Sequence, residues 1–360
     1  MRDVYFNRTI NLLVLTKSME LKRIRINTAS PQKSRARVLI VYTGGTFGMT
    51  YDSEGVLIPF DFGLILEHLP TLKNLALELT VISFDKPIDS SNVEPEHWRT
   101  LGKIIYDNYV DHDGFVVLHG TDTMAYTASA LSFMLEGLNK PVIFTGAQLP
   151  ITEPRSDARE NLITALELAS AKKDGKPLVP EVCIYFDYEL LRGNRSRKVE
   201  SMQFDAFDSG NYPPLAKAGV KIDYNFSVIR PHQDQPLTLR SRIDPRISIL
   251  KLFPGITAPS VEAILNTRDL RAVILETYGS GNAPTSEALL SALKRVIGAG
   301  VIVLNISQCP GGTVTQGRYE TSRELQQIGV IGGADMTTEA AVTKLMLLLG
   351  EYGPEETRKK

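Results

Sequence analysis

The side chains that could do chemistry lie in short segments rich in hydroxyls and glycine. Thr43-Gly44-Gly45-Thr46 places two threonines around two glycines, which let a backbone turn tightly and approach a ligand. Residues 119–124 (HGTDTM) hold a carboxylate between two threonines, and residues 192–198 (RGNRSRK) end on a lysine. Asp89-Ser90-Ser91 adds further hydroxyls. Taken singly, each segment is also typical of a tight turn or a helix N-cap.

Together, these residue types suit the hydrolysis of an amino-acid amide. A threonine hydroxyl is a weak nucleophile and needs a base to take its proton. A lysine serves as that base where cations or desolvation favour its neutral form, and Arg195 and Arg197 stand beside Lys198 in the sequence. Asp122 can bind an ammonium group, while Ser90 and backbone amides can bind a carboxylate. The expected ligand is therefore a zwitterion.

Composition argues against several other functions. The chain has 360 residues with 40 Lys plus Arg against 41 Asp plus Glu, so its net charge of −1 gives no overall attraction to nucleic acids or anionic membranes. The five histidines lack ligand spacing and pair with neither cysteine, which argues against a metal site. No phosphate-loop signature follows the glycines. We expect no metal site and no nucleic-acid or membrane partner.

The candidate segments follow elements that would position them at one edge of a sheet. Apolar runs predict strands at residues 38–42, 79–84, 114–118, 141–145 and 181–186, with helices at 95–109, 123–138 and 157–171. Continuously apolar strands separated by helices are typical of a parallel sheet covered on both faces. Ligands bind such sheets at the carboxyl ends of the strands, where these segments lie.

The alternation of strands and helices is interrupted once. Residues 208–245 are rich in Pro, Gly, Asn and charge, which predicts a crossover or linker. Beyond them we expect strands at 247–252, 272–276, 301–306 and 330–331, and helices at 260–265, 285–299 and 337–350. The predicted fold class is α/β. It has a larger N-terminal catalytic domain (37–232) with a mixed, mainly parallel sheet, a linker (233–246) and a smaller C-terminal domain (247–360) with a parallel sheet.

Residues 1–36 lie outside this organisation. Their apolar run at 11–15 is too short for a secretory signal, and charges follow it directly. Residues 22–37 carry only basic charge without interleaved aromatic residues, so we interpret residues 1–36 as a solvated basic extension without fixed structure. Met19 is an alternative start. With only Cys183 and Cys309, no disulfide framework is expected, and we predict a cytoplasmic protein.

The segments as a set resemble the bacterial-type L-asparaginases, in particular their cytoplasmic type I branch. Both signatures of that family are present, at residues 42–46 (YTGGT) and 117–123 (VLHGTDT). Further segments similar to type I are residues 89–91, 145–148, 155–157, 192–195, 278–284 and 332–337. The resemblance runs in order along the chain from about Arg37 to the C-terminus.

The resemblance implies hydrolysis of L-asparagine to L-aspartate and ammonia, without a cofactor. Thr46 matches the nucleophile of the family, which forms an acyl-enzyme that water then resolves. Thr121, Asp122 and Lys198 match its second triad, in which the lysine manages the proton of the threonine.

The resemblance also implies how the substrate is held. Asp122 matches the residue that binds the α-amino group and Ser90 the residue that binds the α-carboxylate, with Asp89 and Ser91 as near neighbours. Similar enzymes form homodimers or homotetramers, and Asn282 matches a residue that completes the site of a neighbouring subunit. The implied substrate-binding set is Asp89, Ser90, Ser91, Thr121, Asp122 and the neighbouring subunit's copy of Asn282.

The chain departs from the family pattern at two places. The family has a tyrosine near the nucleophile on the loop after the first signature, where this chain has Leu57; Tyr51 is the nearby phenol, so either Tyr51 takes that role or Thr46 is activated differently. Some type I enzymes also bind asparagine at an effector site through an arginine, a threonine and a cysteine. Those places hold Glu276, Arg197 and Cys309, and a carboxylate in place of the arginine predicts an absent or altered effector response.

Three alternative functions remain open. A glutaminase-asparaginase differs in accepting one more methylene, a binding difference of about 1–3 kcal/mol that residue patterns do not resolve. The amidase subunit of a tRNA-dependent amidotransferase shares the fold but normally carries an extra docking domain, for which a 36-residue extension is too short. A non-catalytic asparagine sensor should lack Thr46, Thr121 or Lys198, and all three are present.

Overall fold

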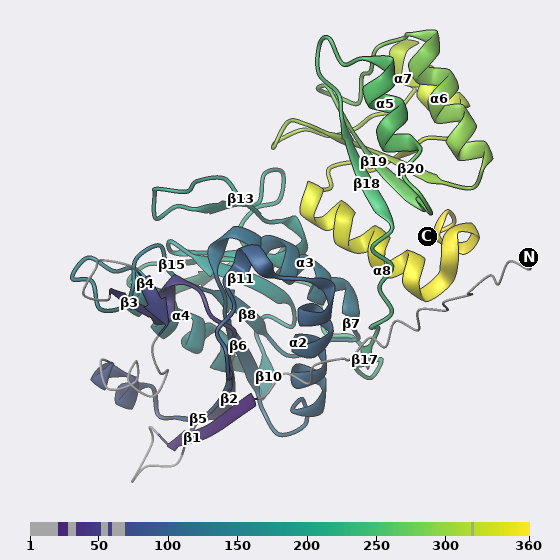
Figure 1. Ribbon diagram of the computed structural model, residues 1–360. Coiled ribbons are helices and arrows are strands. Elements are labelled where there is room, and N and C mark those ends of the chain that lie inside the picture. The colour runs from purple at the N-terminus through teal and green to yellow at the C-terminus, as the bar shows by residue number, and fades with distance from the viewer. Residues whose placement is uncertain (1–20, 28–33, 52–56, 60–68, 318–319) are drawn as a thin grey trace, which may run out of the picture.

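A computed structural model describes residues 21–27, 34–51, 57–59, 69–317 and 320–360. Within these ranges the chain forms a large and a small sheet, each with helices against its faces (Figure 1). This arrangement confirms the predicted α/β class, with a mixed sheet in the larger domain and a parallel sheet in the smaller one. None of the described helices is long and apolar enough to cross a bilayer.

The large sheet has five parallel strands at its centre. In spatial order they are β5 (Leu77–Phe84), β2 (Ala36–Tyr42), β6 (Gly114–Leu118), β8 (Val142–Thr145) and β11 (Val182–Phe186). β6, β8 and β11 are buried along their whole length, which explains their continuously apolar sequences. Antiparallel strands extend the sheet beyond β11: β12 (Glu189–Arg192), β15 (Ala216–Ala218) and β16 (Ile222–Tyr224).

Helices cover both faces of this sheet. One core lies against α4 (Ala158–Ser170) and the other against α2 (Pro95–Asp107) and α3 (Met124–Met134). The helix predicted at 123–138 ends early, because residues 135–136 leave it to form β7 (Leu135–Glu136), which pairs with β17 (Thr238–Leu239). Gly137 follows with φ +79° and no room for a Cβ, since that atom would lie 2.4 Å from the carbonyl oxygen of Pro236.

Two parts of the sequence interpretation need correction. Residues 21–27, expected to be part of a solvated tail, form β1 (Leu21–Asn27), an edge strand antiparallel to β5. Its alternation of basic residues with Ile24 and Ile26 has the period of a strand. The stretch 208–245 is not a simple crossover, because it contributes β15, β16 and β17. Residues 11–15 and Met19 lie outside the described residues.

The small sheet is parallel in the order β18 (Ile247–Lys251), β19 (Ala272–Thr277), β20 (Ile302–Ser307) and β21 (Ile331–Gly332). α5 (Ala258–Leu265) and α6 (Glu287–Gly298) pack on one face, and α7 (Glu320–Gln327) was not predicted. α8 (Thr338–Thr357) packs on the other face and also contacts α3. In Figure 1, α8 therefore lies between the two sheets.

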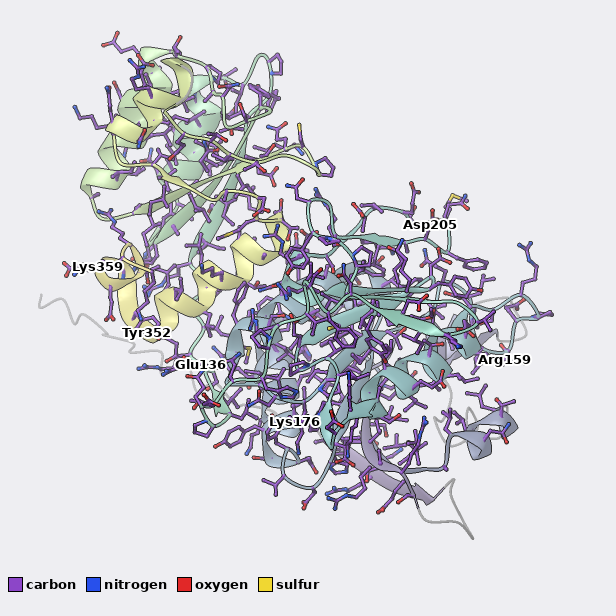
Figure 2. All side chains as sticks on the ribbon, turned by 180° about the vertical axis from the view of Figure 1, so that it is seen from behind. Glu136, Arg159, Lys176, Asp205, Tyr352 and Lys359 are labelled. Atoms are coloured by element: carbon purple, nitrogen blue, oxygen red, sulfur yellow. The ribbon has the colours of Figure 1, made fainter. Side chains whose placement is uncertain are left out.

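α8 meets the N-terminal domain along one side. Tyr352 of α8 and Glu136 of β7 line a common cavity of about 280 Å³ at this junction, and Figure 2 shows the two labelled residues close together. α8 continues past residue 350, where the predicted helix ends, and bends at Gly353, whose φ of 73° is non-helical.

The shorter elements are η1 (Thr46–Gly48), β3 (Met49–Tyr51), β4 (Leu57–Pro59), η2 (Pro70–Leu75), η3 (Ser90–Asn92), η4 (Thr121–Thr123), β9 (Lys172–Lys173), β10 (Lys176–Pro177), η5 (Gly193–Arg195), β13 (Arg197–Lys198) and β14 (Phe207–Asp208).

Candidate functional site

The loops after β5, β2 and β6 pack on one another through glycines. A Cβ on Gly45, where φ is +88°, would lie 2.5 Å from the Cα of Gly120. A Cβ on Gly120 would lie 2.6 Å from the Oγ of Ser90. The three strand-end segments singled out in the sequence therefore meet at one edge of the sheet, and the absence of side chains at two positions sets how closely they approach.

Thr46 is the first residue of η1, directly after Gly45. The segment around it is anchored on both sides. The Thr43 hydroxyl donates to the Leu118 carbonyl at 3.0 Å, and the Tyr42 hydroxyl donates to the Gly48 carbonyl at 3.2 Å. These bonds hold Thr46 beside the end of β6, next to the loop that carries Thr121.

Lys198 brings the predicted second triad together. Its Nζ donates to the Oγ1 of Thr121 and to the Oδ1 of Asp122, each at 2.7 Å. The Lys198 side chain is 18% exposed and that of Asp122 is 63% exposed, so the carboxylate is the member of the pair that is more open to solvent. Asp122 does not cap the helix that follows, and the Thr123 hydroxyl donates instead to the Ser90 carbonyl at 2.7 Å.

Gln148, three residues after β8, belongs to the segment 145–148 that resembles type I asparaginases, but it was not among the predicted site residues. Its Oε1 accepts from the Thr121 hydroxyl at 3.4 Å, and its Nε2 donates to the Gln203 carbonyl at 2.9 Å. The backbone N–H of Gln148 donates to both carboxylate oxygens of Asp157, at 3.0 and 3.1 Å. Burial raises the pKa of Asp157 against these bonds. The strand-end rule that found the other loops also applies to β8 and would have found Gln148.

Ser90 and its neighbours have different surroundings. Ser90 is buried, and its hydroxyl lies close to Gly120. Asp89 and Ser91 are exposed, and the Asp89 carboxylate accepts from the backbone N–H of Ser91 at 3.0 Å. Asp89 thus caps η3, which accounts for its presence without a contact to substrate.

The second signature contains a buried histidine, His119. The Nδ1 of His119 is 2.7 Å from the Gly120 carbonyl, and its Nε2 is 3.0 Å from the Thr127 hydroxyl, which also accepts from the Trp98 indole at 3.2 Å. A neutral imidazole protonated on Nδ1 satisfies every one of these bonds. Burial lowers the pKa of His119 to about 4, so the ring is neutral near pH 7.

Tyr51 and Asn282 are two further predicted residues of the site. Tyr51 ends β3, where the register pairs it with Leu57 of β4, and its side chain lies outside the described part of the chain. The two positions considered for the missing loop tyrosine are thus opposite each other in one hairpin. Asn282 belongs to the C-terminal domain, in a tight turn after β19 whose backbone pairs residue 282 with Tyr278.

Two of the predicted effector residues, Arg197 and Glu276, lie near a second carboxyl group, that of Glu339. Glu276 accepts from the Thr338 hydroxyl at 2.7 Å and has Lys251 at 3.6 Å. Burial raises the pKa of Glu339 of α8, and Arg197 and Glu276 are both near enough for their charges to act on that carboxyl. Cys309 is exposed, in the loop after β20.

One expected neighbour of Lys198 is engaged elsewhere. Arg195, proposed as a cation beside Lys198, forms a two-pronged ion pair with Asp335 of the C-terminal domain. Its charge is therefore balanced by another carboxylate, and Arg197 is the remaining basic neighbour in sequence. Among the described residues, no group of three or more His, Cys, Asp or Glu converges as metal ligands would.

Comparisons with known proteins agree with this architecture. The family model described as "Asparaginase, N-terminal" matches residues 37–230, and that described as "Glutaminase/Asparaginase C-terminal domain" matches residues 246–360. L-asparaginase 1 of Escherichia coli (strain K12) is 41% identical over 329 residues, which cover 90% of this chain and 94% of that protein.

Two further proteins place this similarity in context. The crystal structure of L-asparaginase I from Vibrio cholerae superposes with a TM-score of 0.82 at 39% identity, covering 91% of this chain and 96% of that one. A glutamyl-tRNA(Gln) amidotransferase protein of Methanopyrus kandleri is 35% identical over 331 residues, which cover 87% of this chain and 70% of that protein.

Proposed function

The chain belongs to the asparaginase family of amidohydrolases, and on that premise we propose that it hydrolyses L-asparagine to L-aspartate and ammonia through a Thr46 acyl-enzyme. The observation that carries this proposal is the contact of one lysine amine with both Thr121 and Asp122 at 2.7 Å, beside the loop that presents Thr46. Nucleophile, proton relay and ammonium-binding carboxylate then share one edge of the sheet.

The residues of the site can carry out each step of the hydrolysis. The Thr46 oxygen attacks the side-chain carbonyl carbon of asparagine, while Thr121 takes the Thr46 proton and passes its own proton to the amine of Lys198. Collapse of the tetrahedral intermediate breaks the C–N bond, and the leaving nitrogen takes the proton back from this relay to depart as ammonia. Water then attacks the ester carbon, its proton passes through the relay to the Thr46 oxygen, the ester C–O bond breaks and aspartate is released. No step needs a cofactor or a metal.

The site is matched to a zwitterionic substrate. The exposed carboxylate of Asp122 faces the ammonium of the substrate, and the buried Ser90 hydroxyl faces its α-carboxylate. The Thr121 hydroxyl donates to Gln148 over a long hydrogen bond of 3.4 Å, so it must turn toward Lys198 to pass its proton to the amine. In a homodimer or homotetramer, a neighbouring subunit supplies Asn282. The two cysteines are free, one buried and one exposed, which fits a cytoplasmic location.

The amidotransferase alternative is less well supported. The chain matches 70% of the M. kandleri amidotransferase protein, so part of that protein has no counterpart in the match. Glutamine hydrolysis remains a side activity to be measured. A sensor without catalysis is disfavoured because Lys198 holds Thr121 in a geometry that binding alone does not require.

Ammonia release by wild type and by Thr46→Val tests the proposal. The substitution keeps the size of the side chain and removes the nucleophilic oxygen, so we expect activity on asparagine to fall by at least about 10³-fold. Oligomeric state and thermal midpoint of the variant should match wild type. Near-full activity of Thr46→Val would exclude Thr46 as nucleophile. Inactivity of wild type on both asparagine and glutamine, in an assembled oligomer, would reject the enzyme assignment.

We also propose that the response to asparagine as an effector is absent or altered. The Glu276 carboxylate is buried beside Glu339, so the carboxylate of an effector would meet negative charge where an arginine would attract it. We expect a hyperbolic dependence of rate on asparagine concentration in wild type and in Cys309→Ser. A sigmoidal wild-type curve that becomes hyperbolic in Cys309→Ser would contradict this proposal.

A further inference from the structure

An ion pair joins the catalytic-lysine segment to the C-terminal domain. Arg195 is the last residue of η5, three residues before Lys198, and Asp335 lies in the loop between β21 and α8. Nη1 of Arg195 donates to Oδ1 of Asp335 at 2.9 Å, and Nη2 donates to Oδ2. Two parallel hydrogen bonds fix orientation as well as distance, which a single contact between flexible side chains does not.

The surroundings keep this pair in place on the N-terminal side. The Arg195 side chain is 19% exposed and lies over the ring of Tyr212, 5.4 Å from its centroid. Arg192 lies over the same ring at 4.4 Å and binds the buried Glu181 through two hydrogen bonds of 2.5 and 2.9 Å. Both ends of η5 are therefore anchored, one within the N-terminal domain and the other across the domain junction.

Asp335 is held as firmly on its own side. Ala334 has a left-handed φ of 51°, and its carbonyl accepts from the backbone N–H of Val314 at 2.8 Å. Thr337 caps α8 directly afterwards through its hydroxyl and the N–H of Ala340. The bond to Arg195 lowers the pKa of the Asp335 carboxyl, so the carboxylate is charged at neutral pH. Figure 1 shows α8 beginning on the side of the C-terminal domain that faces β13.

We infer that Arg195 and Asp335 are positioning residues for Lys198. The pair fixes the start of the four-residue run 195–198 relative to the C-terminal domain, while Thr121 and Asp122 receive the lysine at its other end. Docking of the C-terminal domain thereby sets the position of the amine. Displacements of about 1 Å in a catalytic group can cost roughly 10²-fold in rate. This inference rests on the proposed function, since it requires Lys198 to act in the reaction.

The test compares two ion pairs that both engage α8 or the loop before it. Asp335→Asn keeps the shape of the side chain and removes its charge, and we expect kcat to fall about 10- to 100-fold with KM within about twofold. The charge swap Arg195→Asp with Asp335→Arg restores part of kcat. The control is Arg242→Gln, which breaks the ion pair of Arg242 with Glu351 of α8. We expect that control to keep kcat within about twofold.

Each result has a defined meaning. Wild-type kcat in Asp335→Asn would overturn the inference, as would equal losses in Asp335→Asn and Arg242→Gln, because a general role in stability affects both pairs. If Asp335→Asn does not fold, Arg195→Lys decides, because it keeps the charge and removes the two-pronged contact, and an unchanged kcat in that variant overturns the inference. Lys198→Met, assayed in parallel, separates the two proposals: its full activity would reject the proposed role of Lys198, whereas its inactivity beside a fully active Asp335→Asn rejects only the positioning role.

Discussion

The hydroxyl of Thr121 has a defined hydrogen-bond direction. It accepts from Lys198 at 2.7 Å and donates to Gln148 at 3.4 Å, so its lone pairs and its proton have separate partners. The exposed ion pair between Lys198 and Asp122 adds little to stability, about 0–1 kcal/mol. The ion pair matters instead for geometry, because it holds the Lys198 amine between the Thr121 hydroxyl and the Asp122 carboxylate.

His119 predicts a pH dependence of stability. Its folded-state pKa of about 4 lies below the usual value near 6.5, so the native state favours the neutral ring. The contribution of His119 to the free energy of unfolding is complete above about pH 6.5. It is lost as pH falls from 6.5 toward 4, by up to about 3 kcal/mol. Thermal midpoints at fixed protein concentration should fall across this range in wild type, and fall less in His119→Gln.

The matched control for this prediction is His232→Gln. His232 is exposed and bonds the Pro177 carbonyl, so its substitution should leave the pH dependence as in wild type. Equal slopes of thermal midpoint against pH in wild type and His119→Gln would show that the buried ring does not cause the acid loss.

At the scale of elements, the absence of a Cβ at the glycines sets how closely the loops approach one another. Gly120 has an ordinary φ of −65°, so alanine would fit its backbone, but the added Cβ would meet the Oγ and Cβ of Ser90 at 2.6 and 2.7 Å. Gly120→Ala should push η4 away from η3 and displace Thr121 and Asp122. We expect kcat/KM to fall by about 10²-fold or more with a folded protein.

Gly298→Ala provides the comparison for Gly120→Ala. Gly298 ends α6, and a Cβ there would meet nothing within 4 Å. This variant should keep full activity and gain up to about 1 kcal/mol of stability, since alanine is the better helix former. Unchanged kcat/KM in Gly120→Ala would mean that the loops can separate without moving the site.

At the scale of the whole molecule, the C-terminal domain contacts the segment that carries Lys198. The N-terminal domain supplies the strand-end loops, and the C-terminal domain binds Arg195 through Asp335 and carries Asn282, which we propose serves a neighbouring subunit. α8 joins them, because it packs on the small sheet and on α3. Loss of domain docking should therefore reduce activity before either sheet unfolds.

A mixing experiment tests whether Asn282 acts in a neighbouring subunit. Thr46→Val and Asn282→Ala oligomers should each be strongly impaired, because each lacks one component of every site. After dissociation and reassociation of an equal mixture, a paired arrangement restores one intact site in each mixed dimer, or about a quarter of wild-type activity. If Asn282 serves the site of its own subunit, no mixed dimer contains an intact site and mixing restores nothing.

The sequence alone determined the five central strands of the large sheet, the four strands of the small sheet and the loops that carry most of the site. Buried parallel strands must be apolar along their length, so β2, β6, β8 and β11 are visible in the pattern, and the residues that follow them are exposed to ligand by topology. Thr46 and Thr121 were found in this way, and Ser90 was found in the loop after β5. Residue type and basic neighbours predicted Lys198 as a base, and the resemblance to asparaginases placed it in a triad with Thr121 and Asp122.

Only the tertiary structure decided which of these residues touch. Lys198 and Thr121 are 77 residues apart, and Arg195 and Asp335 are 140 apart. Local patterns encode burial and backbone shape over a few residues, whereas these contacts depend on how β13, the end of β6 and the loop before α8 pack. For the same reason the structure, and not the sequence, paired Arg195 with Asp335 and placed Gln148 on Thr121. It also added β1 to the sheet, because an edge strand forms only where a neighbouring strand offers its unpaired backbone.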